Sequence, residues 1–315
     1  MNKIEFGDCR ETMRRWKEQG IKAQICVTSP PYFGLRDYGH DGQLGLEETP
    51  DEYIKAMVEV FRCVWDVLED NGTLWLNIGD SYYNYRPGQG QRQGKQSIAG
   101  QKFSEVENCP KRGLKLEGLK EKDLIGIPWM LAFALRADGW YLRQDIIWHK
   151  PNPMPESVQD RCTKAHEYIF LMSKSQKYHY DTEAMQEQSD RPEGPGNITH
   201  AYQNSAIYGL PEKSSCQSGL LNIGARETRN KRSVWTVPVK PYAGAHFAVF
   251  PSDLIEPCIL AGAPVGGIVL DPFMGSGTTA QVAQNLGRQY LGCELNPEYE
   301  ALQKKRLSQM SLSLD

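Results

Sequence analysis

Residues 267–300 constrain the fold of this 315-residue chain more than any other segment. They begin with a short apolar strand at 267–270, continue through a Gly-rich turn into a helix at 278–286, and end in a second strand at 289–293. This order is typical of the nucleotide-binding half of a doubly wound fold, in which helices connect parallel strands. Strands and helices also alternate near the N-terminus, so we expect an α/β fold with a mostly parallel sheet covered on both faces.

The Gly-rich turn, Asp271-Pro-Phe-Met-Gly-Ser-Gly-Thr-Thr279, predicts a bound ligand. Gly275 and Gly277 allow the backbone to approach a ligand closely, and Glu294, at the tip of the next strand, can accept hydrogen bonds from both hydroxyls of a ribose. No lysine precedes Thr278, so the turn is not a P-loop, and the third glycine of the dinucleotide fingerprint is missing. The sequence therefore predicts an adenosyl ligand that lacks a pyrophosphate.

A second motif, Ser29-Pro-Pro-Tyr32, directly follows an apolar strand predicted at 22–28. Neither proline can donate to a sheet, each fixes its own φ, and the residue before each proline is kept out of the helical region. The backbone here is therefore stiff and extended, with carbonyls available beside an aromatic ring. Taken alone, the motif is equally consistent with a Pro-rich turn and with a rigid polar pocket.

Hydrophobic periodicity and turn residues predict the remaining elements. The predicted helices cover residues 10–19, 50–69 (with a stop at Asp70-Asn71-Gly72), a stretch capped by Asp123 that runs to Ala137, 251–261 and 297–309. The predicted strands cover residues 3–6, 73–78 and 141–148, and residues 166–172 and 178–181 are expected to form a hairpin.

Composition limits the functions that are open to the chain. A net charge of −3 gives no global basic field, so any nucleic acid must be met by local patches. The eight cysteines form no Cys-x-x-Cys pair and the histidines have no ligand spacing, so we expect reduced thiols and no metal site. With no signal-peptide pattern and no membrane-length apolar run, we expect a cytoplasmic protein without a membrane partner.

Together the two motifs resemble the DNA amino-methyltransferases, the N4-cytosine and N6-adenine family, which use S-adenosyl-L-methionine. The order, with Ser29-Pro-Pro-Tyr32 first and the cofactor turn last, resembles the circularly permuted β group. The resemblance implies a Rossmann-like methyltransferase fold, a bacterial, archaeal or phage origin, and Ser29, Pro30, Pro31 and Tyr32 as catalytic residues. It implies cofactor contacts from Asp8, Cys9, His246, Phe250, Asp271, Pro272, Phe273, Gly275, Ser276, Gly277, Thr278, Thr279 and Glu294.

Three further segments carry the resemblance. Gly7-Asp8-Cys9 is similar to the turn whose acid contacts the adenine of the cofactor, and residues 245–251 are similar to the segment that packs on its methionine part. Arg161-x-Thr163-x-x-His166-Glu167 resembles the strand near the target base. The segments 82–122 and 184–232 are not covered by the resemblance.

The resemblance and the polar segments together predict the domain organisation. Residues 1–183 form the catalytic half, with a mobile basic insertion at 82–122 that either closes over DNA or remains a solvated loop. Residues 184–232 occupy the place of the target-recognition region, where Asn197, His200 and Arg229 are among the candidates for reading base edges. Residues 233–315 form the cofactor-binding half.

Ser29 carries the prediction about the substrate. An exocyclic amine is a poor nucleophile because its lone pair is delocalised, and the Ser29 hydroxyl and the Pro30 carbonyl can draw its hydrogens into hydrogen bonds. In the resembled family a serine at this position usually accompanies cytosine N4, whereas Asp or Asn more often accompanies adenine N6. We therefore expect methylation of the N4 amine of a cytosine flipped out of double-stranded DNA.

Several alternatives remain open at this point. N6-adenine methylation is the first of them, followed by an RNA or protein methyltransferase, in which Asn-Pro-Pro-Tyr is more usual, and by a non-catalytic DNA-binding protein. A homodimer and a cognate restriction endonuclease are the further partners that the resemblance suggests.

Overall fold

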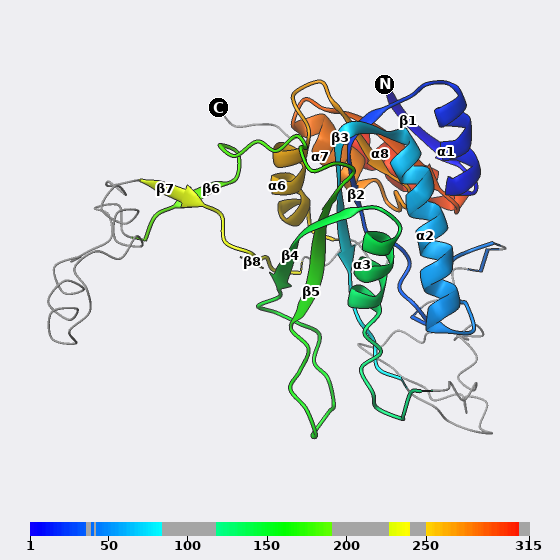
Figure 1. The fold of residues 1–315 in the computed structure, drawn as a ribbon, viewed down its shortest axis with the longest axis vertical. Helices are drawn as coiled ribbons and strands as arrows, with labels where there is room; N and C mark the ends of the chain where they lie inside the picture. Colours follow the sequence, from blue (N-terminus) through cyan, green and yellow to red (C-terminus); the bar gives the residue numbers. More distant parts are fainter. Residues whose placement is uncertain (36–38, 41, 84–117, 191–226, 240–249, 309–315) are drawn as a thin grey trace, which may run out of the picture. The chain divides into compact units, whose positions relative to one another are not determined.

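The computed structural model describes residues 1–35, 39–40, 42–83, 118–190, 227–239 and 250–308 (Figure 1). Two compact units can be distinguished, one formed by Met1–Tyr180 with Ser233–Asp315 and the other by Asp181–Arg232. His246, most of the basic insertion (84–117) and most of the predicted recognition segment (191–226) lie outside the described residues.

The larger unit is built on an eight-stranded sheet. In spatial order its strands are β1 (Asn2–Phe6), β10 (Gln289–Glu294), β9 (Ile268–Asp271), β2 (Ala23–Thr28), β3 (Leu68–Ile78), β5 (His166–Ser173), β4 (Tyr141–His149) and β8 (Val234–Thr236). All neighbouring pairs are parallel except those of β5, which runs antiparallel to both β3 and β4. The prediction of an α/β fold with a mostly parallel sheet is confirmed.

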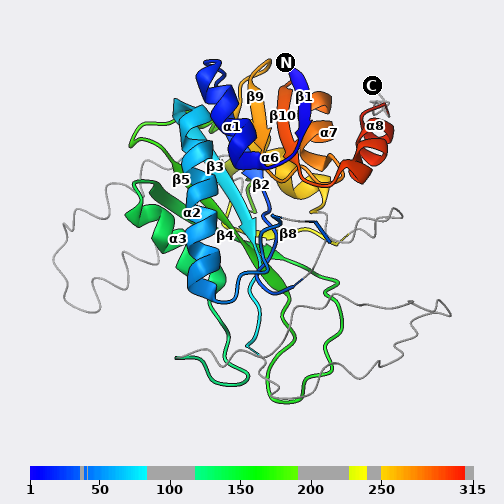
Figure 2. The same ribbon diagram turned by 90° about the vertical axis from the view of Figure 1, so that its right-hand side faces the viewer.

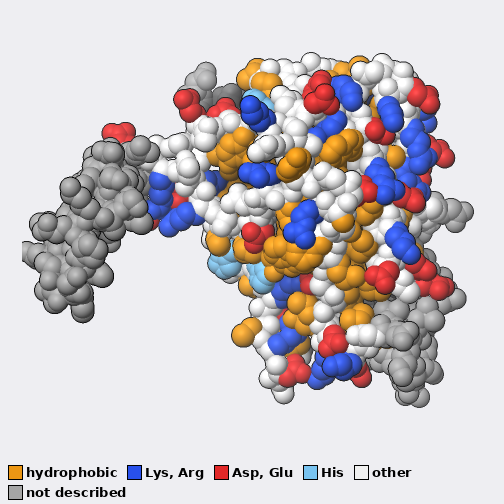
Figure 3. Space-filling view, in the orientation of Figure 1, with side chains coloured by type: hydrophobic (Ala, Val, Ile, Leu, Met, Phe, Trp, Pro, Cys, Tyr) orange, Lys and Arg blue, Asp and Glu red, His pale blue; other side chains and the backbone are white. Residues whose placement is uncertain are grey.

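Helices cover both faces of this sheet. Figures 1 and 2 show α1 (Cys9–Glu18), α2 (Pro50–Val67) and α3 (Ile127–Ala137) on one face, with α6 (Ser252–Gly262), α7 (Thr278–Asn285) and α8 (Glu300–Ser308) on the other. On the α3 side, Figure 3 shows apolar side chains that reach the surface, and Phe133 is 46% exposed. No helix within the described ranges is long and apolar enough to cross a membrane.

The carboxyl ends of the parallel strands gather at one edge of the sheet. β2 lies between β9 and β3, with Cys26 opposite Leu270 on one side and Leu74 on the other. The segments that leave β1, β2, β3, β9 and β10 therefore start side by side, as expected for a doubly wound fold that binds its ligand beyond the strand ends.

The predicted start of α3 is wrong by three residues. α3 begins at Ile127, after Gly126 at a φ of 88°. The Asp80 carboxylate, which follows β3, accepts hydrogen bonds from the Gly126 and Ile127 N–H groups at 3.0 and 3.1 Å. Asp123 instead accepts from Lys120 N–H at 2.8 Å. A carboxylate distant in sequence thus satisfies the free donors at this helix end, which local sequence cannot reveal.

The predicted hairpin is also wrong, because residues 178–181 form no strand. β5 instead pairs with β3 and β4, and Phe170 lies opposite both Leu76 and Asp145. Tyr180 stacks near Trp75, at 6.4 Å between ring centroids. An apolar strand such as β5, buried over its second half, is suited to the inside of a sheet rather than to an exposed hairpin.

The helix stop predicted at Asp70-Asn71-Gly72 lies inside β3. The pairing of β2 with β3 shifts between Ala23, opposite Leu68, and Ile25, opposite Thr73, so this polar stretch forms an irregularity in the strand. The predicted helix stop is therefore wrong, because α2 ends at Val67 and these turn residues form an irregularity within β3.

The smaller unit contains one short antiparallel pair of strands among its described residues. β6 (Gln186–Gln188) pairs with β7 (Thr228–Asn230) in antiparallel register. Arg229 binds Glu187 at 2.9 Å and Asp190 at 2.7 Å, so its guanidinium is engaged within the unit. That residues 184–232 recognise the target remains a prediction.

Candidate active site

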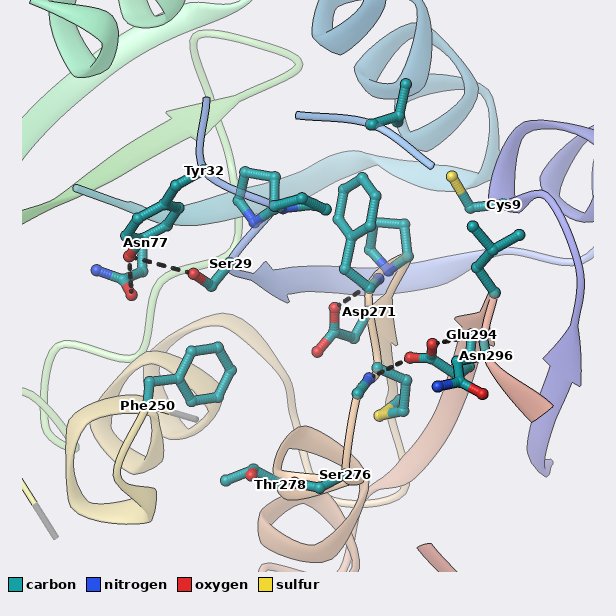
Figure 4. Close-up of a pocket in the computed structure, with 18 of the residues that line it drawn as sticks. Cys9, Ser29, Tyr32, Asn77, Phe250, Asp271, Ser276, Thr278, Glu294 and Asn296 are labelled. Carbon is teal, nitrogen blue, oxygen red and sulfur yellow. Dashed lines mark hydrogen bonds between the residues drawn. The ribbon is translucent and has the colours of Figure 1, made fainter. Parts of the chain in front are cut away.

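One cavity of about 390 Å³ lies at the carboxyl ends of the strands. It brings together most of the predicted site residues, namely Asp8, Cys9, Ser29, Pro30, Pro31, Tyr32, Phe250, Asp271, Pro272, Phe273, Gly275, Ser276, Thr278 and Glu294. Gly277 and Thr279 do not line it. Figure 4 shows Ser29, Tyr32 and Asn77 toward one end and Glu294 and Asn296 toward the other, with Asp271 between them.

Asp271 connects the two motifs. Its carboxylate accepts hydrogen bonds from the Thr28 hydroxyl at 2.6 Å, the Thr279 hydroxyl at 2.6 Å and the Phe273 N–H at 3.0 Å. Thr28 ends β2 just before Ser29, so one buried carboxylate holds the strand end and the Gly-rich turn together. Burial raises the pKa of Asp271 to about 6. The three hydrogen-bond donors act in the opposite direction, because they stabilise the charged carboxylate.

Glu294 fixes the other side of the Gly-rich turn. Its carboxylate accepts from Gly275 N–H at 2.6 Å and from Asn296 N–H at 2.8 Å. Gly275 and Gly277 have φ values of 53° and 86°, in the left-handed region that side chains rarely adopt. Burial raises the pKa of Glu294 to about 7, while its two N–H donors favour the ionised form.

Asp8 and Cys9 form the wall beside β1. Asp8 caps α1 through Arg10 N–H at 2.7 Å and also binds the Arg10 guanidinium at 2.6 Å, which lowers the pKa of Asp8. Burial raises the pKa of the Cys9 thiol to about 12, so this side chain is a neutral apolar contact.

A hydrogen bond from helix α2 fixes the backbone of the Ser-Pro-Pro-Tyr motif. The Tyr53 hydroxyl of α2 donates to the Pro31 carbonyl at 2.9 Å, whereas no group in the described part of the chain donates to the Pro30 carbonyl. The Ser29 hydroxyl donates to the Tyr32 hydroxyl at 3.4 Å, a long hydrogen bond. A Cβ on residue 79 would lie 2.7 Å from the Tyr32 ring, so the ring can occupy this position only because Gly79 has no side chain.

Three residues with no predicted role, Asn77, Lys150 and Glu167, complete this end of the cavity. Glu167 accepts from the Tyr32 hydroxyl at 2.7 Å and from Asn77 Nδ2 at 3.2 Å, and it forms an ion pair with Lys150. Only the segment containing Glu167 carried a sequence signal, through its resemblance to the strand near the target base. Asn77 and Lys150 join the site because β3 and β4 end at the same edge of the sheet.

Comparison with known proteins decides what kind of site this is. A family model described as DNA methylase, for N6 and N4 methyltransferases, matches residues 23–305. The chain belongs to this family. Among its relatives, the type II methyltransferase M.SmaI of Serratia marcescens is 46% identical over 308 residues, which are 97% of this chain and 90% of that protein. The chain is therefore a type II DNA methyltransferase.

Solved structures share the fold of this methyltransferase. The DNA methylase TTHA0409 of Thermus thermophilus, in complex with S-adenosyl-L-methionine, has a TM-score of 0.59 and 23% identity over 99% of this chain and 96% of that one. The PvuII DNA methyltransferase, described as cytosine-N4-specific, has a TM-score of 0.60 and 16% identity over 97% of this chain and 86% of that one. At these identities the likeness concerns the fold.

The cofactor of this methyltransferase is S-adenosylmethionine, and the cavity fits it. The Ser276 hydroxyl is buried within the Gly-rich turn and has no hydrogen-bond partner among the described residues. A buried hydroxyl of this kind is normally satisfied, and a polar ligand can satisfy it here. Glu294 would accept from the ribose and Asp8 would lie at the adenine, while Phe250 would pack on the methionine part. When bound, the cofactor supplies an electrophilic methyl group.

Cofactor affinity is expected to depend on pH through Glu294. Because burial raises the pKa of this carboxyl to about 7, it is protonated below that pH and ionised above it. The ionised form can accept from both ribose hydroxyls, and it accepts more strongly than the protonated form. S-adenosylmethionine should therefore bind more weakly as pH falls from 8 to 6, by up to about tenfold per unit below pH 7. Titration calorimetry should show that binding releases a proton to the buffer, and this release should grow as pH falls below 7.

Glu294→Gln is the matched variant, since it keeps the shape and removes the titration. Its affinity for S-adenosylmethionine should be lower than that of the wild type at pH 8 and nearly constant between pH 6 and 8. An equally steep pH dependence in Glu294→Gln would show that another group is responsible.

Proposed function

We propose that this chain transfers a methyl group from S-adenosylmethionine to the N4 amine of cytosine in double-stranded DNA. The observation that carries the proposal is the pair of acceptors at the substrate end of the cavity, the Ser29 hydroxyl and the Pro30 carbonyl. Both belong to a backbone segment that two prolines stiffen, and the Tyr53 hydroxyl anchors the following carbonyl at 2.9 Å.

These two acceptors suit the chemistry of an amine. Each amine hydrogen can be bound by one acceptor, which turns the nitrogen lone pair away from the ring and toward the methyl group. The nitrogen–carbon bond forms as the carbon–sulfur bond breaks, and the methylated amine then loses one proton to solvent or to a nearby acceptor. A strong base is not needed before the attack, because the proton becomes acidic only after methyl transfer.

The cavity also favours a base that has left the duplex. Ser29 lies beyond a strand end within a hollow, where a stacked base cannot reach it, so the target must rotate out of the helix. The Tyr32 ring can lie against such a base. Cytosine is proposed because of Ser29, and adenine N6 is the competing product, since its amine offers the same two hydrogens.

The proposal is tested by incubating plasmid DNA with the protein and methyl-labelled S-adenosylmethionine, and analysing the nucleosides by mass spectrometry. We expect label in N4-methyldeoxycytidine, with RNA and peptide substrates unlabelled in parallel reactions. Label only in N6-methyldeoxyadenosine would overturn the base assignment, and labelled RNA or peptide with unlabelled DNA would overturn the substrate class.

Because relatives such as M.SmaI and M.Cfr9I are named type II methyltransferases, we further propose that the product protects DNA from an endonuclease of the same sequence specificity. Plasmid prepared from cells that express the protein should resist an endonuclease that cuts at the methylated sequence. Complete digestion of fully methylated plasmid would contradict this role.

A further inference from the structure

A chain of hydrogen bonds runs from Ser29 to an ion pair at the far side of the substrate pocket. The Ser29 hydroxyl lies 3.4 Å from the Tyr32 hydroxyl, which lies 2.7 Å from Glu167 Oε2. The other Glu167 oxygen binds the Lys150 ammonium. All four side chains line the cavity, yet they come from distant parts of the sequence, namely β5 and the segments that follow β2 and β4.

Glu167, at the end of this series of hydrogen bonds, determines which group donates and which accepts in each of them. An ionised carboxylate can only accept hydrogen bonds, so the Tyr32 hydroxyl must donate to Glu167. Burial, reinforced by the Glu167 charge, raises the pKa of Tyr32 well above its usual value, so Tyr32 keeps its proton. With that proton committed to Glu167, the Tyr32 oxygen accepts from Ser29, and the Ser29 oxygen turns its lone pairs toward the cavity.

We propose that Glu167 is a positioning residue that sets this direction, so that Ser29 presents an acceptor and the site selects a base carrying an amine over one carrying a carbonyl. The inference rests on the proposed function, since it concerns how the same pocket recognises its base. The selected amine donates to Ser29 Oγ, whereas the O4 carbonyl of uracil would meet two acceptors, Ser29 and Pro30, with no hydrogen to offer.

Two neighbours hold the Glu167 carboxylate in place. Lys150 pairs with it, and the side chains are only 18% and 15% exposed, so solvent screens the pair weakly. The Lys150 ammonium also lies 4.3 Å from the centre of the Trp148 ring, which holds it beside the carboxylate. Asn77 donates to Glu167 Oε2 at 3.2 Å and to the Tyr168 carbonyl at 3.1 Å, so its amide is oriented as a donor toward Glu167.

Replacing Glu167 with glutamine should allow the donors and acceptors in this series of hydrogen bonds to exchange roles. A glutamine amide can donate as well as accept. When it donates to Tyr32, the Tyr32 hydroxyl can donate to Ser29, and Ser29 then points its hydrogen into the cavity. A carbonyl base would be tolerated in that arrangement, and an amine would meet one acceptor fewer.

Nucleotide-resolution sequencing of methylated DNA first identifies the position that the protein methylates. The test then compares duplexes that carry either cytosine or uracil at that position. Wild-type protein with the cofactor product S-adenosylhomocysteine is expected to bind the cytosine duplex at least about tenfold more tightly than the uracil duplex, each placed opposite guanine. In Glu167→Gln this preference should fall to within about threefold. Its kcat on cytosine should fall about 10- to 100-fold, with KM for DNA and the Kd of S-adenosylmethionine within about twofold of wild type.

Glu156→Gln is the matched control. Glu156 binds Arg161 at 2.6 Å in the segment before β5 and does not line the cavity. Its replacement therefore removes the same charge without changing the hydrogen bonds between Ser29, Tyr32 and Glu167. It should keep the wild-type preference and kcat. Tyr32→Phe offers a second route if Glu167→Gln fails to fold, because it interrupts the chain while keeping the ring, and it should lose the preference in the same way.

The outcomes separate this inference from the function on which it rests. An unchanged preference in folded Glu167→Gln, or in Tyr32→Phe if Glu167→Gln does not fold, would overturn the role of Glu167. A finding that the wild type methylates adenine would overturn the cytosine assignment alone, and the same comparison, with hypoxanthine in place of adenine, would still decide the role of Glu167.

Discussion

Replacing Ser29 with alanine is expected to lower kcat for methyl transfer by about 10²- to 10³-fold, the usual effect of deleting one preorganised hydrogen-bonding group from an active site. The loss falls on the chemical step because the amine keeps only the Pro30 carbonyl as an acceptor, so its lone pair stays delocalised. Cofactor binding should change by less than about twofold, since the predicted cofactor contacts come from the other end of the cavity, around Glu294 and Gly275.

Single-turnover kinetics with saturating S-adenosylmethionine measure this effect directly, and calorimetry measures cofactor affinity in the same preparation. Ser252→Ala is a suitable control, because Ser252 begins α6 and does not line the cavity, and its rate should match the wild type. A Ser29→Ala variant that methylates at the wild-type rate would show that Ser29 does not hold the amine.

The largest effect on stability is expected at Asp271. Asp271→Ala removes the acceptor for the Thr28 and Thr279 hydroxyls and for the Phe273 N–H, all within 3.0 Å of the carboxylate. Leaving such buried donors without partners should reduce the free energy of unfolding by about 2–4 kcal/mol. The loss should be accompanied by weaker cofactor binding and slower methyl transfer, because both motifs are fixed to this one carboxylate.

Urea unfolding followed by circular dichroism tests this expectation. Asp271→Asn retains one acceptor oxygen and should be destabilised less than Asp271→Ala. Asp66→Ala is the matched surface control, since the Asp66 carboxylate pairs with an exposed Lys17 and its removal should leave the unfolding midpoint close to that of the wild type. Equal unfolding midpoints for Asp271→Ala and Asp66→Ala would mean that Asp271 does not join the motifs as described.

Local signals in the sequence were sufficient for both motifs and for the fold class. The prolines after β2 and the glycines after β9 act on their own backbone, and the alternation of strands and helices leads to parallel pairing. Because carboxyl ends of parallel strands meet at one edge, Ser29 and Glu294 could be placed in the same crevice from sequence alone.

The rest of the site depends on pairings between distant residues. Tyr32 and Glu167 meet because β5 runs antiparallel beside β3, whereas the expected hairpin paired that strand with residues 178–181. Asp80 caps α3 for a similar reason, across a polar segment whose length gives no indication of where the chain returns. Contacts of this kind become visible only when the register of the sheet is known.

Nucleotide-resolution sequencing of DNA from a host that expresses the protein tests the central claim most directly, because it reports both the modified base and its sequence context. Parallel cultures should express wild-type protein, Ser29→Ala and Ser252→Ala. We predict N4-methylcytosine at nearly every copy of one short sequence in DNA from the wild type and from Ser252→Ala, and strongly reduced methylation with Ser29→Ala. N6-methyladenine in place of N4-methylcytosine, or undiminished methylation with Ser29→Ala, would contradict it.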